Sequence, residues 1–82
     1  NPFNPITSLQ YGLSKDGAVN ITIYDMMGRI VKRLVDGPQT AGFKTVQWDA
    51  TNDRNESISA GLYLYTMQTG QQRETGKMVL IK

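Results

Sequence analysis

Apolar and polar residues alternate with a period of two along most of the chain. This alternation places the apolar residues of each run on one side of a pleated strand. The runs are rich in β-branched and aromatic residues, which favour strands. They cover residues 9–13, 19–24, 45–49 and 62–65. Residues 28–35 are the nearest candidate for a helix, but the segment is short and β-branched, so we expect a strand there as well.

Turn residues separate these strands at short intervals. Residues 25–28 predict a type I turn in which Asp25 accepts backbone N–H groups and Gly28 takes a positive φ. The segment Asp36-Gly37-Pro38 is expected to end the third strand, and residues 69–72 to close the last hairpin. Residues 50–60 form the longest loop, which we expect to be polar and flexible, with Asn55 serving a turn.

Six or seven strands joined by such turns predict an all-β fold, an antiparallel β-sandwich. At 82 residues the chain is expected to form a single domain with one thin core and no room for a deep active-site cavity. We expect residues 1–6 to form an Asn-Pro-rich leading segment and residues 7–82 the sandwich. The two prolines stiffen the leading segment, and Phe3 is placed to pin it onto the sandwich.

Composition removes several classes of function. The chain has no Cys and no His, so thiolate metal sites and the commonest general base are excluded. The net charge is only +2 and the basic residues are scattered, so we expect no nucleic-acid partner. No apolar run approaches 18 residues, so we expect no membrane span. The chain begins with Asn1 and carries no signal-peptide pattern, so we expect a segment of a longer protein.

A series of short motifs spans almost the whole chain and gives it a resemblance to a known family. In chain order the motifs are Asn1-Pro2-Phe3-Asn4-Pro5, Leu9-x-Tyr11-x-Leu13, Ile23-Tyr24-Asp25-x-x-Gly28-Arg29-x-Val31, Leu34-Val35, Ala41-Gly42, Val46-x-Trp48-Asp49, Gly61-Leu62-Tyr63 and Lys77-Met78-x-Leu80-x-Lys82. This order resembles the type A C-terminal sorting domain of type IX secretion, which is similar to the immunoglobulin-like domain of flagellar hook-capping proteins. The family pattern departs at Ala50 and Asn55, where glycines are usual.

The resemblance implies an immunoglobulin-like or fibronectin III-like sandwich of six to seven strands that is not an enzyme and needs no cofactor. It implies a sorting and anchoring domain that directs a parent protein across the outer membrane of a Gram-negative bacterium. The implied partners are the type IX translocon, a sortase-like protease and an amino-terminal cargo domain of the same chain. The implied location is secreted or at the cell surface, after passage through the periplasm.

The resemblance also places the recognition signal toward the last strands. The implied partner-recognition residues are Gly61, Tyr63, Lys77, Met78, Val79, Leu80, Ile81 and Lys82. The residues themselves add a physical reason, because both faces of the segment 77–82 are apolar. Either Val79 and Ile81 are covered by a loop or the leading segment, or they form an exposed apolar strand that docks on a partner, with the terminal lysines keeping it soluble.

Two other groups of side chains suggest binding sites. The loop after Trp48 is rich in oxygen ligands and is a weak candidate calcium site, because its spacing differs from an EF-hand and an Asx-rich turn is the favoured interpretation. Its candidate ligands are Asp49, Asn52, Asp53 and Asn55, with Glu56 nearby. The aromatic residues suggest the alternative function, a polysaccharide-binding or structural spacer module of a secreted glycoside hydrolase. We expect Trp48 in the core, and Tyr63 and Tyr65 as an exposed pair opposite Leu62 and Leu64.

Overall fold

Six strands make up the fold of the residues described by the computed structural model, 7–70 and 72–81. They are β1 (Thr7–Leu13), β2 (Gly17–Tyr24), β3 (Ile30–Gln39), β4 (Gly42–Trp48), β5 (Gly61–Thr69) and β6 (Gln72–Leu80). Each predicted run therefore overlaps a strand, although Asp49 follows the end of β4 and residues 28–29 belong to the turn before β3. The expected leading segment at 1–6 and the terminal Lys82 lie outside the described residues.

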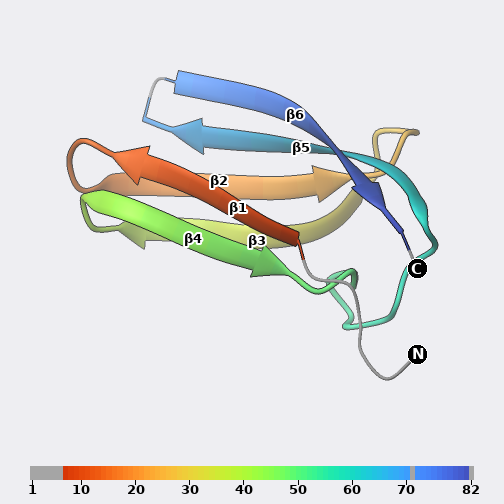
Figure 1. The fold of residues 1–82 in the computed structure, drawn as a ribbon. Coiled ribbons are helices and arrows are strands. Elements are labelled where there is room, and N and C mark those ends of the chain that lie inside the picture. Colours follow the sequence, from red (N-terminus) through yellow and green to blue (C-terminus); the bar gives the residue numbers. More distant parts are fainter. Residues whose placement is uncertain (1–6, 71, 82) are drawn as a thin grey trace.

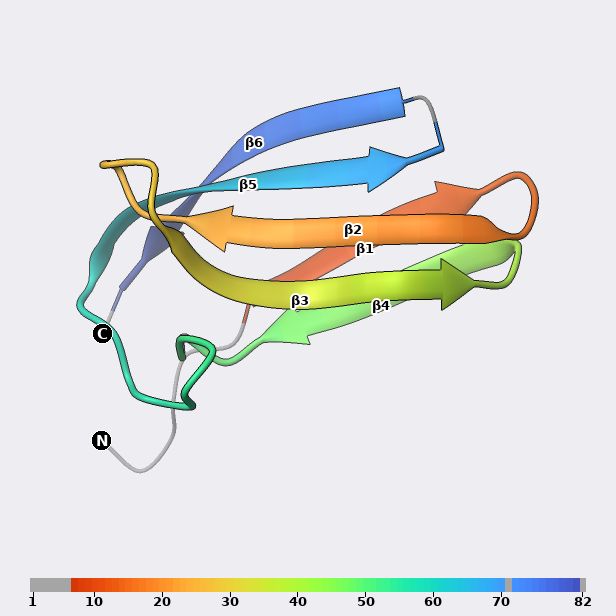
Figure 2. The ribbon, with the colours of Figure 1, turned by 180° about the vertical axis from the view of Figure 1, so that it is seen from behind.

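The strands form two antiparallel sheets. β1 pairs with β4, and the second sheet has the order β3-β2-β5-β6. Opposite views show the two-stranded sheet lying against one face of the larger sheet (Figures 1 and 2). This arrangement confirms the predicted all-β sandwich. We call the face of the four-stranded sheet that turns toward β1 and β4 the inner face, and the opposite one the outer face.

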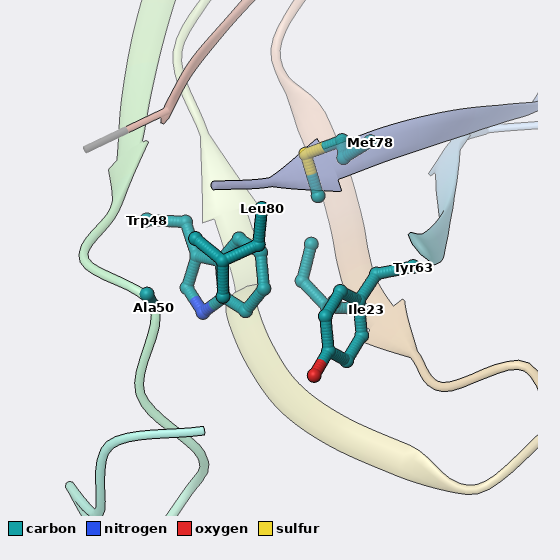
Figure 3. Close-up of a cluster of buried hydrophobic side chains, with 6 residues drawn as sticks. All are labelled: Ile23, Trp48, Ala50, Tyr63, Met78 and Leu80. Carbon is teal, nitrogen blue, oxygen red and sulfur yellow. The ribbon is translucent and has the colours of Figure 1, made fainter. Parts of the chain in front are cut away.

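The core lies between the two sheets and follows the predicted alternation in β2. Val19, Ile21 and Ile23 are all buried, and Trp48 at the end of β4 is 1% exposed. Figure 3 shows how side chains from distant parts of the chain converge around Ile23 and Trp48. The cluster comprises Ile23, Trp48, Ala50, Tyr63, Met78 and Leu80. The prediction that Trp48 is a core residue is thus confirmed.

β3 is longer than the sequence predicts. It runs through the expected terminator at Gly37 and Pro38, which pair with Val19 and Ala18 of β2. β3 lies at the edge of its sheet and has only β2 as a neighbour. A proline lacks the backbone N–H but is tolerated on an edge strand, where one side of the backbone needs no ladder partner. The prediction that this segment ends the strand was wrong for this reason.

The two faces of β5 are the reverse of the prediction. Tyr63 is buried, whereas Leu62 is 38% exposed. The Tyr63 ring packs edge-on against Trp48, with ring centroids 5.6 Å apart, and its hydroxyl donates a hydrogen bond to the Ser59 carbonyl at 2.6 Å. A tyrosine hydroxyl bonded to the backbone a few residues upstream is the corner typical of immunoglobulin-like sandwiches. The larger ring fills the core, and its polar tip is satisfied there.

Close packing at Gly76 gives a stability prediction. A Cβ atom added to Gly76 would lie 2.4 Å from the ring of Tyr65, its cross-strand partner. We expect Gly76→Ala to displace this ring and lower the free energy of unfolding by about 1–2 kcal/mol, as overpacking does. Urea denaturation measures the change.

Gly17 provides the matched control for this substitution. A Cβ atom added at Gly17 would meet no atom within 4 Å. Gly17→Ala is therefore expected to change the free energy of unfolding by less than about 0.5 kcal/mol. Equal losses at the two positions would show that the Tyr65 ring does not set the requirement for glycine at position 76.

Candidate interaction surface

The turn between β2 and β3 is held by one carboxylate. Asp25 Oδ1 accepts the backbone N–H groups of Met27 and Arg29, both at 2.9 Å, and Oδ2 accepts the Arg29 Nε at 2.9 Å. The Gly28 N–H donates to the Asp25 carbonyl at 3.0 Å, and Gly28 has φ 84°. The predicted turn is confirmed, and its geometry projects Met26 and Met27 outward, at 58% and 79% exposure.

The same contacts lower the pKa of Asp25 below its ordinary value. The main cause is the hydrogen bond from the backbone N–H of Arg29, and partial desolvation acts in the opposite direction. A carboxyl group whose pKa is lowered on folding stabilises the fold above the pKa of the unfolded chain. That stabilisation is lost as the pH falls through the lower, folded-state pKa.

This linkage predicts a local response to acid. Between about pH 6 and about pH 2 we expect the Met27 and Arg29 amide signals to move as Asp25 takes up a proton, with a midpoint below the ordinary aspartate value. In Asp25→Asn that movement should be absent. Two-dimensional NMR of both proteins measures it, and a midpoint at or above the ordinary value in the unsubstituted chain would contradict the assignment.

The implied partner-recognition residues divide by face along β5 and β6. Tyr63, Met78 and Leu80 are buried on the inner face. Lys77 is exposed, as is Gly61 at the start of β5. Val79 and Ile81 are 65% and 76% exposed. Of the two interpretations left open by the sequence, exposure of the apolar outer side is the one found among the described residues.

Further apolar residues lie at the same end of the sheet and were missed from the sequence. The strand register pairs Leu62 with Val79, and it pairs Tyr24 with both Ile30 and Leu64. We define the outer-end surface as the exposed residues Met26, Met27, Ile30, Leu62, Val79 and Ile81. The half-buried Tyr24 and Leu64 lie on the same face. Figures 1 and 2 show that the β2–β3 turn and the end of β6 lie at the same end of the molecule.

The candidate calcium loop is organised by hydrogen bonds within the protein. Asn52 Oδ1 accepts the N–H groups of Arg54 and Glu56, both at 2.9 Å. The Asp53 carboxylate accepts the backbone N–H of Arg33 at 3.0 Å and the Arg33 guanidinium at 3.1 Å.

Other groups of the protein occupy further loop oxygens: Asp49 Oδ1 accepts the Thr51 hydroxyl at 2.5 Å, and Glu56 Oε1 accepts the Asn52 amide at 2.9 Å. Asn55 Oδ1 accepts Lys32 Nζ at 3.3 Å, and the Asn52 carbonyl accepts the same ammonium group at 3.1 Å. Asn55 has φ 62°, so the prediction that it serves a turn is confirmed. The bridge between Thr51 and Ser57 closes the loop, whose geometry favours the Asx-rich turn.

Within residues 7–70 and 72–81, no three His, Cys, Asp or Glu side chains gather as a metal site would require. A hollow of about 520 Å³ lies at the far end of the sandwich and is lined mainly by the turn at 12–18 and by Thr69, Gly70 and Gln72. The described residues include no helix with the length and apolar character that a membrane span requires.

Comparison with known proteins identifies the type of sandwich. The sequence model of the FlgD Ig-like domain matches residues 6–73. The fold is similar to that of FlgD from P. aeruginosa, with a TM-score of 0.70 and 23% identity over 93% of this chain and 61% of that one. It is also similar to FlgD from Xanthomonas campestris, whose structure is described in terms of the hook capping essential for flagellar assembly. That comparison gives a TM-score of 0.69 and 27% identity over 93% of this chain and 56% of that one.

These matches cover only part of the solved proteins. The chain spans about three fifths of the length of each FlgD structure. No curated protein sequence matches the chain significantly.

The comparisons correct the function predicted from the motifs. They support the hook-capping side of the resemblance, and the type IX sorting function, its translocon, its sortase-like protease and the secreted or cell-surface location were wrong. The alternative of a polysaccharide-binding or spacer module has no support either. The exposed tyrosine pair expected for such a module is absent, because Tyr63 lies in the core and Tyr65 packs against the core.

Proposed function

Because the chain belongs to the family of FlgD Ig-like domains, we propose that it is the Ig-like module of a hook-capping protein and that it serves flagellar hook assembly as a non-enzymatic scaffold. The observation that carries this proposal is the family match over residues 6–73, together with a similar fold over 93% of the chain. We propose that residues 1–82 act as one module of a parent protein whose other parts complete the activity.

A scaffold module acts through the partners that its surface contacts. The small buried core and the absence of Cys and His leave binding as the activity that this chain best supports. Among the implied recognition residues we propose that Lys77, Val79 and Ile81 contact a partner directly. The buried Tyr63, Met78 and Leu80 instead fix the position of β5 and β6. Calcium binding at the 49–56 loop is not part of this proposal.

Replacement of the segment in its parent gene tests the proposed function. We expect a Gly-Ser linker of equal length, encoded in place of residues 1–82, to abolish hook formation as seen by electron microscopy, and with it swimming motility. Immunoblotting of the parent protein separates a loss of function from a loss of the protein. Normal hooks at a normal protein level would contradict the proposal.

Phe43→Ser is the matched control in the same gene. Phe43 is 97% exposed at the opposite end of the sandwich from the outer-end surface. Its replacement should leave the fold, the hooks and the motility unchanged.

A further inference from the structure

We propose that the outer-end surface is the docking site for an amphipathic helix of a protein partner, with apolar side chains on the docked side and carboxylates along its flanks. The inference deepens the proposed scaffold function and rests on it for the partner being a protein. The chemistry of the helix is derived from the described residues alone.

Exposed apolar side chains are concentrated in one place. Among residues 7–70 and 72–81, six of the seven exposed large hydrophobic residues belong to the outer-end surface, and Phe43 lies at the other end of the molecule. Single exposed hydrophobic residues are common on soluble proteins, whereas a contiguous group of them marks an interaction site. The neighbouring Tyr24 and Leu64 make the apolar surface continuous from β3 to β6.

The dimensions of this surface fit a helix that crosses the strands. Ile30, the half-buried Tyr24, Leu62 and Val79 come from β3, β2, β5 and β6, which are successive strands of one sheet. Neighbouring strands lie about 4.8 Å apart, so the surface extends about 14 Å across the sheet. At about 1.5 Å per residue, a helix of two to three turns covers this length, and its side chains at every third and fourth position form one apolar stripe.

The charges around the surface select an acidic partner. Lys77 is exposed beside Val79 and has no carboxylate within ion-pair distance among the described residues. Arg29 is exposed in the adjacent turn. Asp25 is neutralised by Arg29, and Asp36, an acidic residue of the outer face, pairs with Asn20 near the far end of β2. An unpaired cation beside an apolar surface complements carboxylates that flank an apolar stripe.

The same charges disfavour two other occupants. A second copy of the chain would bring a second Lys77 to the contact, whereas the described carboxylates near this end, Asp25 and Asp53, are already paired with Arg29 and Arg33. An anionic membrane needs a cluster of four to eight basic residues for strong attraction. Among the described residues, Lys77, Arg29 and Arg33 lie on or near the surface, and the two arginines are already paired with Asp25 and Asp53.

Titration of the 82-residue chain with designed peptides tests the proposal. The probe is a 16-residue helical peptide with a leucine stripe flanked by glutamates, and the comparison peptide carries lysines in place of the glutamates. By ¹⁵N NMR we expect the acidic peptide to shift the amide signals of Ile30, Leu62 and Val79. The affinity for the basic peptide should be at least tenfold lower, and added salt should weaken binding of the acidic one.

Three variants make the test specific. Val79→Asp should weaken binding of the acidic peptide at least tenfold, and Lys77→Glu should reverse the preference between the two peptides. Phe43→Asp, at the opposite end, should leave both affinities unchanged. All three positions are exposed, and Trp48 fluorescence verifies that each variant is folded.

Several results would overturn the docking proposal. Equal binding of the two peptides, or no binding, would remove the acidic helix as the occupant. Concentration-dependent dimerisation abolished by Val79→Asp would assign the surface to a second copy. Binding to phosphatidylglycerol vesicles without peptide binding would assign it to a membrane. Because these measurements use the isolated chain, they can fail while the gene-replacement experiment still supports the scaffold function.

Discussion

Trp48→Ala is expected to lower the free energy of unfolding by about 3–5 kcal/mol, the usual loss for a large aromatic side chain removed from a core. Trp48 is 1% exposed and lies in the buried cluster with Ile23 and Leu80 (Figure 3). Its Nε1 donates to the Thr51 carbonyl at 2.9 Å, so the substitution also releases the start of the 51–57 loop. A small domain has little stability to spare, and the variant should be largely unfolded at physiological temperature.

Urea denaturation followed by circular dichroism measures this loss. Phe43→Ala is the control, because Phe43 is an aromatic strand residue that is 97% exposed, and it should cost less than about 0.5 kcal/mol. A Trp48→Ala protein as stable as the Phe43→Ala protein would show that Trp48 is not the centre of the core.

Tyr63→Ala should be almost as costly, at about 3–4 kcal/mol. The substitution removes the ring that packs edge-on against Trp48 and contacts the inner side of β6. Tyr63→Phe keeps this packing and loses only the hydrogen bond to the Ser59 carbonyl, so it should cost about 1 kcal/mol. The difference between the two variants separates the packing from the hydrogen bond.

The same denaturation experiment measures both Tyr63 variants. An unchanged free energy of unfolding in Tyr63→Ala would contradict the burial of Tyr63. It would support the solvent-exposed position on β5 that the alternation of the sequence predicts. A loss in Tyr63→Phe as large as that in Tyr63→Ala would instead assign most of the effect to the hydroxyl group.

The alternation predicts which side of a strand is buried only when one side is clearly polar. In β2, Asn20 and Thr22 alternate with isoleucines, and the isoleucines are buried as predicted, although Thr22 on the other side is buried as well. In β5 the two sides are Leu-Leu and Tyr-Tyr, so hydrophobicity alone does not choose between them. The choice depends on Trp48 and on the Ser59 carbonyl, which accepts the tyrosine hydroxyl. Both partners are brought to Tyr63 by the tertiary fold.

The position of a strand in its sheet is a second property that the sequence does not reveal. Pro38 ends a strand in most contexts, but β3 lies at an edge and continues past it. The sequence alone shows that the segment ending in Val79 and Ile81 has two apolar faces. The sequence does not group Met26 and Ile30 with Val79, because only the pairing of β2 with β3 and β5 brings them to the same end of the sheet.

The short motifs predict the architecture better than the function. The run from Ile23 to Val31 encodes a strand, an aspartate-capped turn and a second strand, and all three are present. Such a strand–turn–strand unit can form in any β-sandwich that contains this hairpin. It therefore does not distinguish the sorting domains from the hook-capping domains. The match over residues 6–73 makes that distinction, because it draws on most of the chain rather than on single motifs.

The position of this chain on growing flagella tests the proposed role most directly. A hook-capping module should be found at the distal tip of hooks that are still elongating. We expect immunogold labelling of an epitope inserted in the exposed turn at residues 14–17 to mark these tips in electron micrographs. Gold particles distributed over the cell surface, with none at hook tips, would contradict the account.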